Sequence, residues 1–172
     1  MNLSRFPRRT LAAGLLLAAA GHAPASGNHA GGHGPDAGIG EPGEPARVSR
    51  TVEVTMNDAM RFVPERIRVR RGETVRFAVR NAGQLKHEFV LGTERELKAH
   101  YEQMKRFPGM EHEEPNMVSL PAGGQGEVVW RFTRAGTVHF ACLQVGHYEA
   151  GMKGRVQVAG QPPVSTNLRK SQ

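Results

Sequence analysis

Cysteine is almost absent from this sequence. The 172 residues include one, Cys142. A single cysteine excludes a disulfide within the chain, so its thiol is either free or bound to something else. A lone cysteine is most often a buried small hydrophobic residue. The alternative is a soft metal ligand, and the surrounding sequence has to decide between the two.

The chain also lacks an apolar run long enough to cross a bilayer. The run at residues 11–21 is too short, and it follows three arginines, Arg5, Arg8 and Arg9. Small residues come next, ending at Ala25. This order is typical of a secretory signal peptide. We therefore predict a signal peptide over residues 1–25, cleavage near Ala25 and an exported protein. The paired arginines leave both the Sec and the twin-arginine routes open.

Large apolar residues are nearly missing from residues 26–46, a stretch rich in Gly, Pro and Ala. Such a segment buries too little surface to offset the entropy of ordering. We predict a flexible tail there, a folded domain over residues 47–160, and a short C-terminal tail over residues 161–172.

A strong excess of one charge is missing from the mature chain. Without residues 1–25 it carries 20 basic and 16 acidic side chains, a net charge of +4. Aromatic residues make up 6% of the sequence, and the arginines are scattered along alternating segments instead of clustering with them. This arrangement is typical of a solvated sheet face and argues against a nucleic-acid-binding surface.

What the sequence does contain is alternation with period two. Val75, Phe77 and Val79 alternate with polar or small residues after a glycine turn, and similar segments recur from residue 47 onward. About seven short strands separated by glycine turns predict an antiparallel sandwich or barrel.

One segment breaks the alternation. Thr93 and Glu96 have the spacing of a capping box, and Leu97, Tyr101 and Met104 follow at helical spacing. We predict one short helix from about 94 to 106, inserted in a loop between strands.

Four residues of ligand type stand in the strand region: His87, Cys142, His147 and Met152. Two imidazoles and a thiolate, with a weak axial thioether, are the donor set of a mononuclear copper electron-transfer site. Cys142 ends one strand, the following loop returns His147, and Met152 opens the next strand. His87 comes from a distant strand. The sequence therefore predicts that these four residues bind one copper ion.

The segments GTVHFACLQVGHYEAGMKGRVQV and FVPERIRVRRGETVRFAVRNAG resemble the ligand loop and the opening strands of the cupredoxin family, which includes plastocyanin, azurin and pseudoazurin. The resemblance covers most of residues 52–158. It implies an all-β, Greek-key β-sandwich with a type 1 copper held by His87, Cys142, His147 and Met152. A finer resemblance is to exported bacterial cupredoxins associated with copper tolerance, which implies a periplasmic location.

The sequence departs from the family pattern in two places. Four residues separate Cys142 from His147, as in azurin, and four separate His147 from Met152, as in plastocyanin. A blue and a green site both remain open. In addition, Glu88 stands where many members carry an asparagine that braces the ligand loop.

Several further residues are candidates for a weaker second copper site. These are His29 and His33 in the predicted tail, and Met110, His112 and Met117 in an irregular loop. His139 and His100 fit structural positions better, because His139 faces away from Cys142 and His100 falls on the helical stripe. Most remaining methionines, and Trp130, are expected in the core.

The predicted function is a periplasmic type 1 copper protein with one-electron redox activity that contributes to copper tolerance. The alternative is a dedicated electron carrier between respiratory or photosynthetic partners. A copper enzyme is disfavoured, because Ala141 stands where multicopper oxidases place a bridging histidine and no His-x-His pair is present. A metal-free adhesion or scaffold sandwich is a third possibility. We expect copper and a redox partner protein, with no nucleic acid and no membrane span in the mature form.

Overall fold

The structure is a computed structural model that describes residues 38–108, 110 and 113–160. The predicted signal peptide, the C-terminal tail, His29, His33 and His112 lie outside these residues. Within the described part of the chain, no helix is both long enough and apolar enough to cross a membrane.

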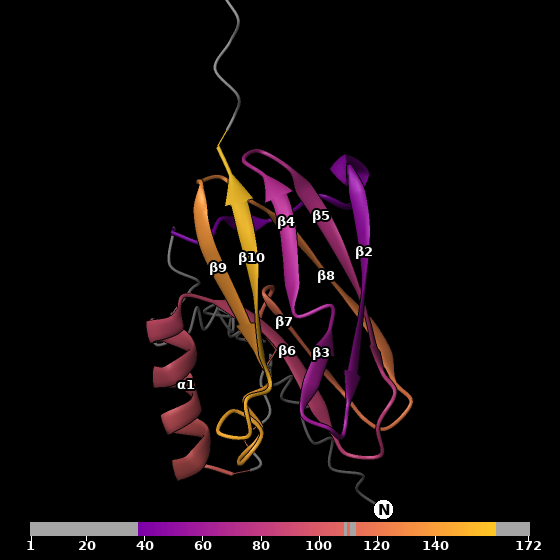
Figure 1. Cartoon of the computed structure of the whole chain (residues 1–172), viewed down its shortest axis with the longest axis vertical. Coiled ribbons are helices and arrows are strands. Elements are labelled where there is room, and N and C mark those ends of the chain that lie inside the picture. The colour runs from indigo at the N-terminus through magenta and orange to yellow at the C-terminus, as the bar shows by residue number, and fades with distance from the viewer. Residues whose placement is uncertain (1–37, 109, 111–112, 161–172) are drawn as a thin grey trace, which may run out of the picture. The chain divides into compact units, whose positions relative to one another are not determined.

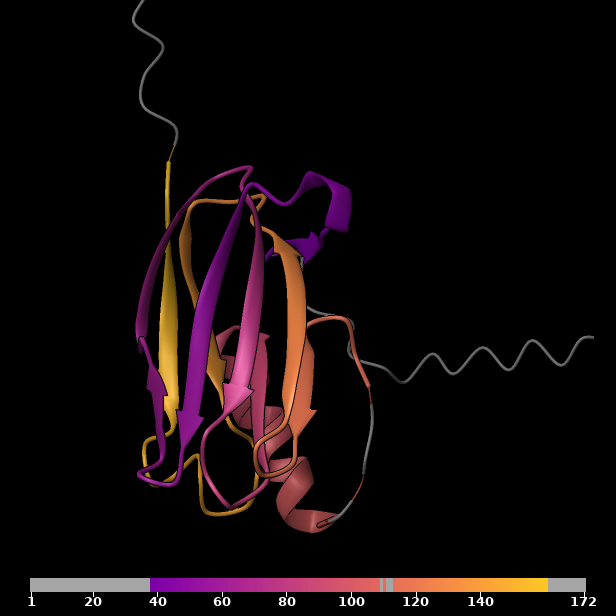
Figure 2. The same ribbon diagram turned by 90° about the vertical axis from the view of Figure 1, so that its right-hand side faces the viewer.

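Two five-stranded sheets form the domain (Figure 1). The first has the order β1-β8-β5-β2-β3, and the second has the order β4-β10-β9-β6-β7. Figure 2 shows β2, β5 and β8 of the first sheet side by side. The prediction of an all-β sandwich with a single helix in a loop is confirmed. The strands are β1 (Glu41–Pro42), β2 (Arg50–Asn57), β3 (Arg61–Val63), β4 (Arg66–Arg70), β5 (Thr74–Asn81), β6 (His87–Gly92), β7 (Met117–Leu120), β8 (Gln125–Arg131), β9 (Gly136–Ala141) and β10 (Lys153–Ala159).

Two strand pairs are parallel, which the expectation of a purely antiparallel arrangement missed. β2 pairs with β5, and β4 pairs with β10. The chain leaves the first sheet after β3, forms β4 in the second sheet, and returns as β5 beside β2. The alternation of apolar residues shows which face of a strand is buried, but it carries no information on the direction of the neighbouring strand.

The core lies between the sheets and is built on aromatic rings. Phe62 and Phe140 pack edge to face with centroids 5.1 Å apart, and Phe89 lies 5.0 Å from Phe140. Trp130 is fully buried, as expected, and its Nε1 donates a hydrogen bond to the carbonyl oxygen of Ile39 at 2.8 Å. Cys142 and Met152 belong to the same cluster, so the predicted metal ligands adjoin the core.

The domain begins earlier than residue 47, so the predicted end of the tail at residue 46 is wrong. Glu41 and Pro42 pair with β8, and a 3-10 helix (Pro45–Arg47) follows. Ile39 is 2% exposed and anchors this segment in the core. Gly40 has φ +112, and a Cβ there would lie 2.1 Å from the carbonyl oxygen of Arg131. Composition suggested a tail because one apolar anchor among glycines and prolines gives no periodic pattern.

The predicted helix is confirmed as α1 (Glu94–Arg106). Thr93 and Glu96 form the capping box, since the Thr93 hydroxyl accepts from Glu96 N and the Glu96 carboxylate accepts from Thr93 N. The buried residues of the helix are Leu97, Tyr101 and Met104. They form a second apolar cluster that includes Val90 of β6 and Ala141 of β9. Figure 1 shows α1 beside β9 and the loop between β9 and β10.

Candidate metal centre

One of the four predicted ligands comes from β6, and the other three come from the loop between β9 and β10. His87 is the first residue of β6, Cys142 directly follows β9, and Met152 directly precedes β10. β6 and β9 are antiparallel neighbours, with Val90 opposite Ala141. This register brings the start of β6 and the end of β9 to the same end of the sheet. His87 and Cys142 therefore come close together although they are far apart in the chain. The hydrogen bond from Glu88 N, next to His87, to Sγ of Cys142 joins residues that are 54 positions apart.

The donor atoms of His87, Cys142 and His147 lie together, all within 4.8 Å of one another. Nδ1 of His87 is 3.2 Å from Nδ1 of His147, and Sγ of Cys142 is 3.3 Å from Nδ1 of His147. Metal–ligand bonds of roughly 2.0–2.3 Å, as found for zinc, place the donors of a trigonal site about 3.5–3.8 Å apart. The donors thus stand close to a coordinating arrangement. Two imidazoles and a thiolate in a trigonal set fit copper.

The backbone closes the ligand loop, residues 142–152, on itself. Cys142 N donates to the carbonyl oxygen of Met152 at 3.1 Å, and Met152 N donates to that of His147 at 3.0 Å. His147 N donates to the carbonyl oxygen of Gln144 at 3.0 Å. These bonds hold the ends of the loop together and bring Met152, which is fully buried, beside the other ligand residues.

Burial controls the protonation of the sulfur ligand. It raises the pKa of Cys142 to about 12, and the hydrogen bond from Glu88 N at 3.3 Å opposes this only in part. The copper-free thiol is therefore neutral at pH 7, and a metal must displace its proton to bind. Burial, with repulsion from His87, lowers the pKa of His147. A neutral imidazole has the free nitrogen that a metal requires.

The Glu88 carboxylate braces the ligand loop at the place where the family pattern has asparagine. It accepts a hydrogen bond from Gln144 Nε2 at 2.6 Å and one from the Ser119 hydroxyl at 3.4 Å. These contacts connect β6, β7 and the ligand loop. Glu88 therefore braces the ligand loop in place of the family's asparagine, through its hydrogen bond with Gln144.

A second brace, which the sequence did not predict, connects α1 to the ligand loop. The Tyr101 hydroxyl donates to the Glu149 carboxylate and accepts from Gly146 N at 3.0 Å. The ring of Tyr101 stacks on Tyr148 with centroids 5.0 Å apart. Tyr101 was predicted only as a core residue of the helix, and its spacing gave no sign that its hydroxyl reaches the loop.

Asp58 is another residue that sequence reasoning missed. Its Oδ1 lies 2.9 Å from Nε2 of His87, the ring nitrogen that does not face His147. Hydrogen bonds from Gln84 N and from His87 lower the pKa of this carboxyl. An ionised carboxylate at 29 positions from its partner leaves no local pattern in a sequence.

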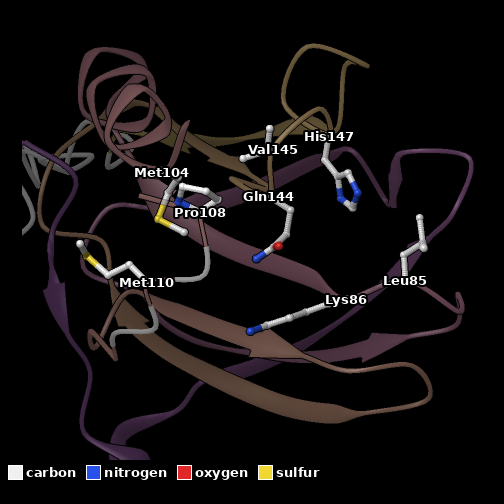
Figure 3. A pocket seen from close by; sticks show the side chains of 8 residues that line it. All are labelled: Leu85, Lys86, Met104, Pro108, Met110, Gln144, Val145 and His147. Carbon is white, nitrogen blue, oxygen red and sulfur yellow. The ribbon is translucent and has the colours of Figure 1, made fainter. Parts of the chain in front are cut away.

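A pocket of about 340 Å³ adjoins the imidazole of His147. Figure 3 shows Met104, Pro108 and Met110 at one end of the pocket and His147 with Leu85 at the other. Met117, proposed with Met110 for a second copper site, lies in β7 and packs against the cluster under α1 instead. His139 lies in β9 opposite Arg155, and His100 lies on α1, so neither is among the three grouped donors.

Comparisons with known proteins agree with this geometry. Residues 48–159 match the family model "Copper binding proteins, plastocyanin/azurin family". The chain is 54% identical over 132 residues to the copper-resistant cuproprotein CopI of Rubrivivax gelatinosus, covering 76% of this chain and 80% of that protein. It is 34% identical over 188 residues to the protein of the same name from Pseudomonas aeruginosa, covering 89% and 98%.

Solved structures match the fold. Reduced auracyanin from the photosynthetic bacterium Roseiflexus castenholzii superposes with a TM-score of 0.56 at 23% identity, covering 65% of this chain and 98% of that one. Auracyanin B gives a TM-score of 0.55 at 24% identity, covering 73% and 96%. The family match spans β2 to β10 and all four predicted ligands. The chain therefore belongs to the plastocyanin/azurin family of copper-binding proteins.

Proposed function

We propose that this chain is an exported type 1 copper protein that exchanges one electron and contributes to copper tolerance in the periplasm. His87, Cys142 and His147 would hold the copper ion, and Met152 would supply a fourth, weaker sulfur donor. Relatives named for copper resistance, matched over most of their length, support the tolerance role. The arginine-led apolar segment at residues 1–21 supports export.

The observation that carries the proposal is the meeting of three donor atoms at the buried end of β6 and β9, with separations of 3.2 and 3.3 Å. A bound copper ion supplies a one-electron couple at this position. The thiolate of Cys142 and the thioether of Met152 suit Cu(I), while the imidazoles also suit Cu(II). The closed loop and the braces from Glu88 and Tyr101 hold these ligands in place, which keeps the rearrangement on electron transfer small.

An absorption spectrum tests the centre directly. Purified protein loaded with Cu(II) should show intense visible charge transfer from the Cys142 thiolate, and Cys142→Ser should abolish it, because a hydroxyl is a poor soft ligand. Met117→Leu is a matched control, since it alters a sulfur residue that packs under α1. A colourless wild-type protein after loading refutes the copper centre.

Growth of a deletion strain on copper tests the physiological role. If the protein serves copper tolerance, the strain grows poorly at raised copper, and wild-type protein restores growth while Cys142→Ser does not. The rival function is an electron carrier for respiratory or photosynthetic partners. The exposed side chains of Leu85 and Val145 beside His147 favour this rival, since an apolar rim suits brief docking of a redox protein. Normal growth on copper together with a respiratory or photosynthetic defect would support the carrier.

We further propose that the chain is not an enzyme and that any second copper binds more weakly than the first. The proposal about catalysis rests on Ala141, which stands beside Cys142 where a histidine would bridge to further copper ions. Met104 and Met110 line the pocket next to His147 and offer thioethers to Cu(I). His29 and His33 offer imidazoles from residues outside the described part of the chain.

A further inference from the structure

Asp58 contacts a metal ligand from the side away from the metal. It lies in the turn after β2, and its Oδ1 is 2.9 Å from Nε2 of His87. The imidazole is fully buried, whereas the Asp58 side chain is 37% exposed. Nδ1 of the same ring faces Nδ1 of His147 at 3.2 Å. His87 thus lies between a carboxylate and the metal position.

The same carboxylate is held in place by the backbone that leads into β6. Gln84 N donates to Oδ2 at 2.7 Å, and Leu85 N donates to Oδ1 at 3.3 Å. The chain passes so close that a Cβ on Gly83 would lie 2.0 Å from Oδ1. Asp58 therefore fixes the approach to His87 as well as the ring itself.

The direction of the proton in this contact follows from the chemistry of the two groups. An ionised carboxylate only accepts hydrogen bonds, so Nε2 of His87 must carry the hydrogen. A neutral imidazole with its hydrogen on Nε2 has a lone pair on Nδ1. That lone pair is directed to the side where Cys142 and His147 lie.

We propose that Asp58 is a positioning residue for the copper centre: it fixes the Nε2–H tautomer of His87, and its negative charge favours Cu(II) over Cu(I) and so lowers the reduction potential. A carboxylate bonded to a ligating histidine orients the ring and raises its basicity. Cu(II) carries one more positive charge than Cu(I), so a nearby anion stabilises it more strongly. The inference rests on the copper centre proposed above and assigns its redox tuning to a residue that is not a ligand.

The tautomer is tested on copper-free wild-type protein, without any substitution. Nitrogen-15 NMR of the imidazoles distinguishes a protonated ring nitrogen from one with a free lone pair. We expect the hydrogen of His87 on Nε2 and a free Nδ1. A hydrogen on Nδ1 of His87 in the wild-type protein overturns the proposal.

The charge effect is tested with three variants by voltammetry of the copper-loaded protein. Asp58→Asn removes the charge and keeps one acceptor oxygen, while its amide nitrogen replaces the acceptor either of Gln84 N or of Leu85 N and His87. We expect the ratio of Cu(II) to Cu(I) affinity to fall about tenfold, which raises the one-electron potential by about 59 mV. Asp58→Glu keeps the carboxylate and should return the potential toward the wild-type value.

Glu53→Gln is the matched control. It removes one negative charge from an exposed position of the same strand region, five residues before Asp58. Five extended residues span roughly 16 Å, so Glu53 lies farther from Asp58 than the screening length of about 8–10 Å in physiological salt. The reduction potential of Glu53→Gln should therefore equal that of the wild-type protein.

The outcomes separate this inference from the proposed function. A coloured Asp58→Asn protein with the potential of the Glu53→Gln control overturns the role of Asp58 and leaves the copper centre intact. A colourless wild-type protein refutes the copper centre itself. If Asp58→Asn does not fold, the proposal is decided by the tautomer of His87 in the wild-type protein and by the potential of Asp58→Glu. Because the glutamate keeps the carboxylate, a rise of about 59 mV in the potential of Asp58→Glu would count against the proposal.

Discussion

The buried thiol of Cys142 should make the copper-free protein lose stability in alkali. In the fold, burial raises its pKa from the ordinary 9.0 to about 12. Between these values the unfolded chain releases the thiol proton while the folded chain keeps it, so the free energy of unfolding falls as the pH rises. Three pH units at 1.36 kcal/mol each give a loss of about 4 kcal/mol by pH 12. Below pH 9 the contribution of the neutral thiol is fully present.

Urea unfolding of copper-free wild-type protein and Cys142→Ser at pH 8, 10 and 11 measures this loss. Serine does not titrate in this range, and its hydroxyl still offers an acceptor to Glu88 N. Tyrosine and lysine titrations affect both proteins and cancel in the difference. We expect the wild type to lose about 2–3 kcal/mol more than the variant between pH 8 and pH 11. A difference that does not change with pH refutes the reasoning, because it would mean that the thiol titrates alike in the folded and unfolded chains.

Three further predictions concern the axial ligand, the helix brace and the N-terminal segment. Met152→Leu should keep copper and raise the reduction potential, because a donor that stabilises Cu(II) is lost. Met152→Gln should lower the potential, because it supplies a harder oxygen donor. Voltammetry that shows no change in either variant contradicts axial binding by Met152. Tyr101→Phe leaves Gly146 N without its acceptor, so it should lower the free energy of unfolding, measured in urea, by about 1–3 kcal/mol. Tyr148→Phe is the control, because it keeps the stacked ring. Equal losses in the two variants would show that the contact of the Tyr101 hydroxyl with the loop contributes nothing. A chain that begins at residue 47 should be about 2–4 kcal/mol less stable than one that begins at residue 38, because it loses the buried Ile39 and the hydrogen bond from Trp130 to the Ile39 carbonyl oxygen. Equal unfolding midpoints for the two chains would show that residues 38–46 are not part of the fold. Copper counting on the residue-38 chain and on the mature protein then measures what His29 and His33 add.

Local patterns in the sequence determined the elements of this protein. Apolar residues alternate along β5 because one face of that strand packs in the core. α1 was predicted with its bounds, because Thr93 and Glu96 satisfy each other's backbone donors within four residues. Three of the four predicted ligands, Cys142, His147 and Met152, also came from a local pattern, because they lie in one short loop after β9. All of these signals come from residues close in the chain, and the copper-binding chemistry of the loop follows from residue types alone.

Only the tertiary structure decided how the elements meet. Strand direction in the β2–β5 and β4–β10 pairs depends on the path of the chain between the sheets, which alternation does not encode. The carboxylates of Asp58, Glu88 and Glu149 reach partners 29, 56 and 48 positions away, so no spacing rule finds them. The raised pKa of Cys142 is likewise a property of its burial and not of its neighbours in the chain. The sequence thus determined which atoms can bind copper, and the fold determined how those atoms are oriented and charged, because both depend on contacts between residues that are distant in the chain.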